Sequence, residues 1–276
     1  MEIILRSNKQ REAYASLFGI KDLSIDRNLI TLEELKEKNY ENIFITLDKN
    51  MFNSDLFFLE KTLKELDKLN IRGVLFYDLA VLSITKRLDL DLNLIWAGDF
   101  LTTNYKTCNY YFKEGVKGVL ISNVLTCDEI CEISKQVELD TYVNIFGKEM
   151  MTISKRHLIS NYFEYINEKD QKEKHNMIEK DKSYRITEAS YGTKIYSDYV
   201  LNGIVYLDRL KQAGVKYIIL DDFDIESSIF EKVLNIFNSA IKDCKNLELK
   251  EKEIDKLIET KRGFFDKKTI YKVKKK

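Results

Sequence analysis

The sequence predicts an α/β fold, a TIM-like (β/α) barrel, from the rhythm and character of its apolar runs. Five short runs start roughly 25 residues apart, and the stretches between them carry apolar residues at helical spacing. The runs are continuous, as expected of parallel strands that are buried on both faces. They cover residues 42–47, 71–77, 93–97, 117–122 and 141–146.

Local signals in the gaps predict where helices begin and end. A hydroxyl residue followed three positions later by glutamate forms a capping box, in which each side chain accepts a backbone N–H at the helix start. Gly115 and Gly214 each follow a predicted helix, where a left-handed residue ends it. Asn104 precedes the predicted helix 105–112 and is a suitable N-cap. The capping boxes are Thr31 with Glu34, Thr126 with Glu129 and Ser228 with Glu231.

The second half departs from this rhythm. Residues 164–182 are rich in charge and predict a surface excursion, and residues 183–197 predict a β-hairpin. We therefore expect one barrel domain over residues 1–260, complete or distorted, with an open doubly wound sheet as the alternative. The βα order resumes with a helix at 202–213, a strand at 215–220 and a helix at 228–244.

The C-terminal segment, residues 261–276, is strongly basic and alternates lysines with apolar or aromatic residues. This pattern suits a terminal β-strand whose lysines face solvent. It also suits a segment that follows phosphates on aromatic platforms, and the two interpretations are compatible. The candidate nucleic-acid contacts are Lys267, Lys268, Lys272 and Lys274.

Composition and motifs exclude several classes of protein. Lys+Arg 45 and Asp+Glu 45 balance, and the motifs of P-loop, dinucleotide-binding, lipase-type and zincin proteins do not occur. The first residues lack the apolar run of a signal peptide, and the longest apolar stretch, 74–82, is too short for a membrane helix. We therefore expect a cytoplasmic protein that does not enter a membrane and keeps its four cysteines reduced. Cys127 and Cys131 share a helix face, where buried thiols are favoured over metal ligands.

Aspartates follow several predicted strands. The carboxyl ends of barrel strands form the site face, so these residues are candidate acids, bases or ligands. The alternative is that they cap the helices that follow. The residues are Asp78, Asp99, Asp221, Asp222 and Asp224.

A cluster of polar residues follows the run at 141–146. Residues 147–162 include side chains that can hold an anionic or polar substrate, although a solvated turn is an equal alternative. The cluster contains Ser154, Lys155, Arg156, His157 and Asn161.

The same residues resemble the collagenase-like U32 peptidase family. Residues 147–160 align without gaps on the family signature, and Gly147, Ser154, Arg156 and Ser160 are retained. Met151, residues 154–156, Asn161-Tyr162 and the tail at 263–274 are similar to the shorter, cysteine-poor branch.

This resemblance implies a TIM-like barrel and membership of a family that is named for peptidase or collagenase activity. Several relatives instead hydroxylate tRNA, ribosomal RNA or quinone precursors with an iron–sulfur cluster on four cysteines. A short and a long member are expected to act together on the wobble uridine of tRNA, with prephenate linked to the reaction. Here the two signature cysteines fall on Met150 and His157, so we expect no cluster in this chain.

The expected function is therefore that of a cluster-free subunit in tRNA wobble-uridine 5-hydroxylation, paired with a longer paralogue that holds the cluster. One alternative is a peptide hydrolase that uses Ser154, His157 and Asp222. Another is a non-catalytic scaffold barrel. The candidate substrate-binding residues are Asp78, Asp99, Asn104, Lys155, Arg156 and Asn161.

Overall fold

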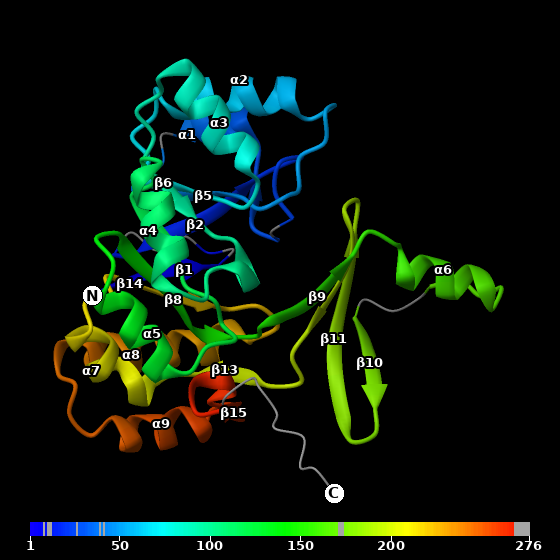
Figure 1. Ribbon diagram of the computed structural model, residues 1–276. Coiled ribbons are helices and arrows are strands. Elements are labelled where there is room, and N and C mark those ends of the chain that lie inside the picture. The colour runs from blue at the N-terminus through cyan, green and yellow to red at the C-terminus, as the bar shows by residue number, and fades with distance from the viewer. Residues whose placement is uncertain are drawn as a thin grey trace, which may run out of the picture.

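A closed barrel forms the body of the protein (Figure 1). The computed structural model describes residues 1–7, 9, 13–25, 27–38, 40, 42–170 and 174–267, and within them eight parallel strands form a ring. Strand β14 closes this ring because it pairs in parallel with both β1 and β8. The predicted TIM-like barrel is thus confirmed. In chain order the strands are β1 (Glu2–Arg6), β2 (Ala15–Ile20), β4 (Ile43–Leu47), β5 (Gly73–Phe76), β6 (Leu94–Trp96), β7 (Gly118–Leu120), β8 (Asp140–Gly147) and β14 (Tyr217–Asp221).

Helices surround the barrel (Figure 1). Those that follow β4, β5, β6 and β7 each lead to the next strand of the ring. The connection from β1 to β2 has only residues 7–14, which is too short for a crossover helix. The helices of the body are α1 (Leu32–Lys38), α2 (Leu56–Leu66), α3 (Leu79–Leu88), α4 (Tyr105–Lys113), α5 (Cys127–Lys135), α7 (Leu207–Gln212), α8 (Ser227–Lys242) and α9 (Leu247–Asp255). None of the helices among the described residues has the length and apolar run that crossing a bilayer requires.

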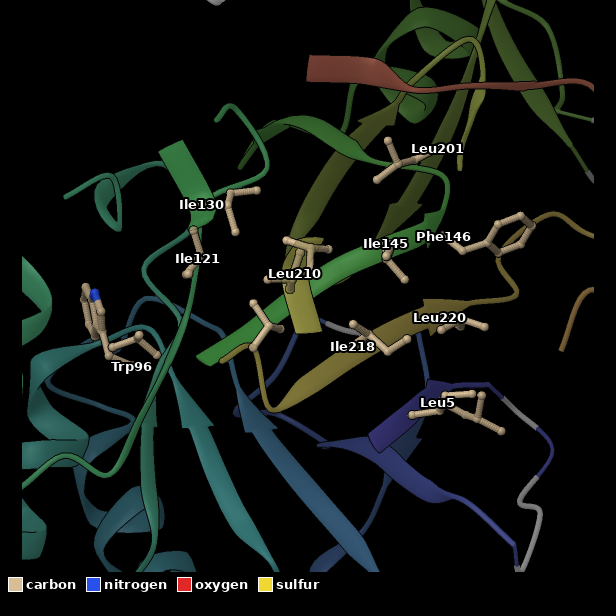
Figure 2. Close-up of a cluster of buried hydrophobic side chains, with 14 of the residues drawn as sticks. Leu5, Trp96, Ile121, Ile130, Ile145, Phe146, Leu201, Leu210, Ile218 and Leu220 are labelled. Carbon is tan, nitrogen blue, oxygen red and sulfur yellow. The ribbon is translucent and has the colours of Figure 1, made fainter. Parts of the chain in front are cut away.

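Two apolar cores lie on the two sides of the strands. The outer core packs the barrel against its helices, and Figure 2 shows part of it around β8 and β14, with Ile145, Ile218 and Leu210. The inner core fills the barrel and includes Phe44 and Tyr142. Burial on both faces explains why the strand sequences are continuous apolar runs.

Two of the three predicted capping boxes are present in the structure. Thr126 caps α5: its hydroxyl accepts from the Glu129 N–H at 3.3 Å, and the Glu129 carboxylate accepts from the Thr126 N–H at 2.8 Å. Thr31 and Glu34 form the same arrangement before α1. The prediction at Ser228 was wrong, since α8 begins one residue earlier and the Ser228 hydroxyl donates to Glu226.

Replacing Thr126 by alanine is expected to lower the free energy of unfolding by about 1 kcal/mol, because one helix-start N–H loses its side-chain acceptor. Chemical denaturation of both proteins would measure the difference. A matched change of Thr152 to alanine should have a smaller effect, because the Thr152 side chain is exposed. Equal destabilisation by the two changes would contradict the role of the cap.

A sheet arm projects from the barrel between β8 and β14 (Figure 1). It is antiparallel, with strand order β10-β11-β12-β9. The predicted hairpin at 183–197 is confirmed as β11 and β12, but two expectations need correction. The polar stretch 147–162 contains a strand that pairs with β12, and the charged excursion 164–182 contains a strand that pairs with β11. The elements of the arm are β9 (Met150–Ser154), α6 (Leu158–Tyr165), β10 (His175–Glu179), β11 (Lys182–Ala189) and β12 (Gly192–Tyr196).

The described part of the basic segment lies against the body of the protein. Lys261 belongs to a two-residue strand that pairs with β13, and Phe265 stacks on Tyr206 with ring centroids 5.1 Å apart. The terminal strand predicted for the segment 261–276 is not formed at residues 263–265, which are a short 3-10 helix, and residues 268–276 lie outside the described residues. The remaining short elements are β3 (Leu29–Ile30), β13 (Val200–Asn202), β15 (Thr260–Lys261), η1 (Asp99–Leu101), η2 (Ile204–Tyr206) and η3 (Gly263–Phe265).

Candidate functional site

The carboxyl ends of the barrel strands carry a layer of polar side chains. Alternate residues of a strand point to the same side, so the residue two positions beyond an inward apolar side chain also faces the barrel axis. Beyond the inner core, this rule leads to polar residues that line a cavity of about 90 Å³ at the barrel mouth. They are Arg6 after Ile4, Tyr77 after Leu75, Ser122 after Leu120, Asn144 after Tyr142 and Asp221 after Ile219.

A charged network closes one side of this mouth. The Arg27 guanidinium lies 2.7 Å from an Asp221 carboxylate oxygen and 2.6 Å from one of Asp222. It also donates to the Arg6 carbonyl at 2.8 Å, and the Ser7 hydroxyl donates to Asp222. Both aspartates are mostly buried, so the shared cation offsets their repulsion. On this side of the mouth the two carboxylates are therefore paired with cations and hydroxyl groups of the protein itself.

The neighbouring side is formed by the turn that leaves β8, the strand that pairs with β14. Gly147 has φ +123° and a Cβ there would lie 2.7 Å from the Asp221 backbone, so only glycine suits this turn. Lys148 follows, with its ammonium group donating to the Ser197 carbonyl at 3.1 Å, and burial lowers the pKa of Lys148. The charges of Asp224 and Asp198 partly offset the effect of burial, and the half-buried ammonium group is suited to a polar or anionic ligand.

Glu149 lies next to this lysine and also lines the cavity. Burial raises the pKa of Glu149 to about 7, although the Tyr199 hydroxyl donates to its carboxylate at 2.7 Å and favours the charged form. The group therefore changes charge near neutral pH and can donate or accept a proton at the mouth.

The arm leans over the mouth and contacts the barrel rim. Lys194 of β12 is buried and donates to the Ile25 carbonyl, and Tyr196 lies 4.3 Å from Phe223 between ring centroids. A second cavity, of about 580 Å³, lies between the arm and the loops after β2 and β4. The arm thus forms part of the wall of the site.

Two asparagines from the neighbouring strands β7 and β8 lie side by side at the mouth. Asn144 of β8 donates from Nδ2 to the Oδ1 atom of Asn123, which follows β7, at 3.0 Å. Both residues are partly exposed and line the cavity.

Two of the predicted substrate-binding residues, Asp78 and Asn104, cap the helices that follow them. Asp78 caps α3, accepting from the Ala80 N–H at 2.9 Å and from the Met51 N–H at 2.8 Å. Asn104 caps α4, accepting from the Thr107 N–H at 2.9 Å. Asp99 begins the short helix η1, and its side chain lies outside the described part of the chain. The first two are thus placed as helix caps.

Ser154, His157 and Asp222 do not come together. Ser154 ends β9 and its hydroxyl accepts from the Arg156 N–H at 3.2 Å, whereas the His157 imidazole lies 3.6 Å from Glu188. Asp222 belongs to the charged network at the barrel mouth. The three candidates of the hydrolase alternative therefore have different neighbours.

The basic candidates lie on the arm and near the C-terminus. The Lys155 ammonium group lies 3.7 Å above the Phe52 ring of the barrel rim, while Arg156 and Asn161 are exposed. Lys267 is also exposed. Lys268, Lys272 and Lys274 lie outside the described residues. Of these side chains, those that the structure describes do not line the cavity at the barrel mouth.

The residues that sequence reasoning missed are Arg6, Arg27, Asn123, Asn144 and Glu149. Arg6 and Asn144 could have been found from the sequence, because each lies two positions beyond a residue whose side chain faces the barrel interior. Arg27 had none, since its partners lie almost 200 residues away in the sequence.

The cysteines do not form a cluster site. Cys127 and Cys131 are neighbours on α5 with Sγ atoms 3.9 Å apart, Cys108 is buried on α4, and Cys244 follows α8. Among the described residues, no group of three or more His, Cys, Asp or Glu side chains is arranged to hold a metal ion.

Comparison with known proteins identifies the relatives of this chain. The model of peptidase family U32 matches residues 18–274. The chain is 28% identical over 260 residues to tRNA hydroxylation protein P2 of Bacillus subtilis, covering 86% of this chain and 84% of that protein. It is 24% identical over 138 residues to tRNA hydroxylation protein P1 of the same organism, covering 48% of this chain and 33% of P1.

Two solved structures are similar at 9% sequence identity. The crystal structure of oxaloacetate acetylhydrolase has a TM-score of 0.42 and matches 86% of this chain and 77% of that one. The crystal structure of 2,3-dimethylmalate lyase, of the PEP mutase/isocitrate lyase superfamily, has a TM-score of 0.41 and matches 88% and 81%.

Proposed function

Since the chain belongs to peptidase family U32, and since its similarity to tRNA hydroxylation protein P2 extends over most of both chains, we propose that it acts in the hydroxylation of tRNA. The base modified is the wobble uridine, at its 5 position. The chain is a subunit of this system and works with a longer family member. The match to P1 over only a third of that protein's length supports a longer partner of the same family.

The barrel mouth is the substrate site in this proposal. Its polar layer, its half-buried Lys148 and its proton-exchanging Glu149 suit a small polar or anionic group that enters between the rim and the arm. The exposed Arg156 on the arm, together with Lys155 and the tail lysines, contacts phosphate outside the mouth.

The iron–sulfur cluster belongs to the longer partner in this proposal. The four cysteines of the chain lie on α4, on α5 and after α8, and two of them are buried neighbours on one helix. This donor set does not fit a cluster held by four thiolates. The residues of this chain would therefore bind and orient the substrate.

Peptide hydrolysis has less support from the geometry. A serine nucleophile needs a base within hydrogen-bond reach. Here the Ser154 hydroxyl accepts from a backbone N–H, and the His157 imidazole lies beside Glu188.

Deletion of the gene is expected to remove 5-hydroxyuridine derivatives from tRNA. Mass analysis of tRNA nucleosides would measure them, and the wild-type chain supplied in trans should restore them. The Ser154→Ala chain should restore them equally, and neither chain should cleave gelatin. Unchanged nucleosides in the deletion strain would contradict the proposal, and cleavage that depends on Ser154 would support the hydrolase alternative.

A further inference from the structure

We infer that Asn123 and Asn144 bind the Watson–Crick edge of a pyrimidine base inserted into the barrel mouth. This inference rests on the proposed function and assigns its base-reading residues. The two side chains lie at the cavity and are bonded to each other at 3.0 Å.

The bond between the two amides leaves a donor and an acceptor free. An asparagine amide has two N–H donors and one oxygen acceptor. Asn144 uses one donor and Asn123 uses its oxygen, so the Asn123 NH₂ group and the Asn144 oxygen have no hydrogen-bond partner among the described residues. If both amides turned over, the two residues would exchange roles, and one NH₂ group and one oxygen would again lack a partner.

A ligand that matches this pair must present an acceptor and a donor side by side on a planar edge. Uracil does so with its N3–H and the adjacent carbonyl oxygen. Paired contacts of this kind are how amide side chains recognise bases. Lys148 lies at the same cavity and supplies a further donor to a carbonyl or phosphate oxygen.

The other walls of the cavity suit a flat ring. Tyr77, Phe100 and Tyr196 line it, and the Phe100 side chain is 54% exposed at the rim. Aromatic side chains stack on bases irrespective of sequence, and an unpaired loop base is the one that costs least to extrude. The apolar floor, with Leu120 and Ile121, continues into the buried cores of the protein.

Substituting aspartate for either asparagine tests the pairing while keeping the shape. In the Asn123→Asp chain, Asn144 still donates to position 123, and in the Asn144→Asp chain Asn123 can donate to position 144. Each variant therefore keeps the mutual hydrogen bond but presents two acceptors to the ligand. The same change at the exposed Asn235 on α8 is the matched control.

Each chain would be supplied to the deletion strain, its thermal melting recorded, and its tRNA nucleosides measured. We expect both mouth variants to melt like the control but to restore hydroxylation at least about fivefold less, the smallest loss expected for one paired base contact. Full restoration by both would show that the asparagines serve only the fold, and would overturn the inference. Failure of the wild-type chain to restore hydroxylation would instead overturn the proposed function.

Photocrosslinking would distinguish a base from a small co-substrate at this site. An anticodon stem-loop with 4-thiouridine at the wobble position would be irradiated with the purified chain, and the crosslinked peptides mapped. We expect crosslinks at Tyr77 or Phe100 that are lost in the Asn144→Asp chain. Crosslinks confined to the arm or the tail, or no crosslink, would overturn the inference.

Discussion

Replacing Phe44 by alanine is expected to lower the free energy of unfolding by about 3–5 kcal/mol, the usual cost of deleting a buried phenylalanine ring. Phe44 is 1% exposed inside the barrel, edge-on to Tyr142 and Tyr217 at centroid distances of 5.9 and 5.7 Å. The Arg72 guanidinium lies 5.0 Å from its ring centroid. Since strand number and stagger fix the barrel diameter, the strands cannot close around the cavity.

Chemical denaturation followed by circular dichroism would measure this loss. The matched control is Phe57→Ala on α2, where the ring is 85% exposed and the change should stay within about 0.5 kcal/mol. A loss below about 1 kcal/mol at Phe44 would mean that the interior repacks, contrary to expectation. The result matters for the site because the inner core, which includes Phe44, supports the polar residues at the barrel mouth.

The barrel was predictable from sequence where a helix separates consecutive strands. The five apolar runs became β4 to β8, and Asn104 and Thr126 cap helices as expected. Strands β1 and β2 did not fit the pattern because the eight residues between them are too few for a crossover helix. The arm strand β9 was not predicted because most of its residues are exposed, so its sequence does not form the apolar run of a buried strand.

The site was predictable only in part. Asp222 follows a predicted strand and lies at the mouth, but its partner Arg27 comes from a distant loop that no local pattern connects to it. The prediction also expected the polar cluster 154–161 in the pocket, whereas the chain enters the arm after Met150. Sequence alone could not show that this turn leaves Lys148 and Glu149 at the mouth and carries Lys155 to the rim.

Replacing Glu149 by glutamine is expected to remove a pH dependence of stability. Burial raises the pKa of Glu149 from 4.5 to about 7 in the native state. Between these pH values the native state holds a proton that the unfolded chain has released, so the wild type loses stability as the pH rises through this window. The loss is on the order of 3 kcal/mol, since the pKa rises by about 2.5 and each unit corresponds to about 1.4 kcal/mol.

Glutamine keeps the size of the side chain and an oxygen that can accept from Tyr199, but it has no proton to release. The variant should therefore match the wild type near pH 4.5 and exceed its stability at pH 8, when urea denaturation is compared at both values. The same change at the exposed Glu253 should leave the pH profile of the wild type unaltered. Parallel profiles for Glu149→Gln and wild type would mean that Glu149 is already charged at pH 5, and the mouth would then lack the neutral carboxyl that can donate to a ligand oxygen at physiological pH.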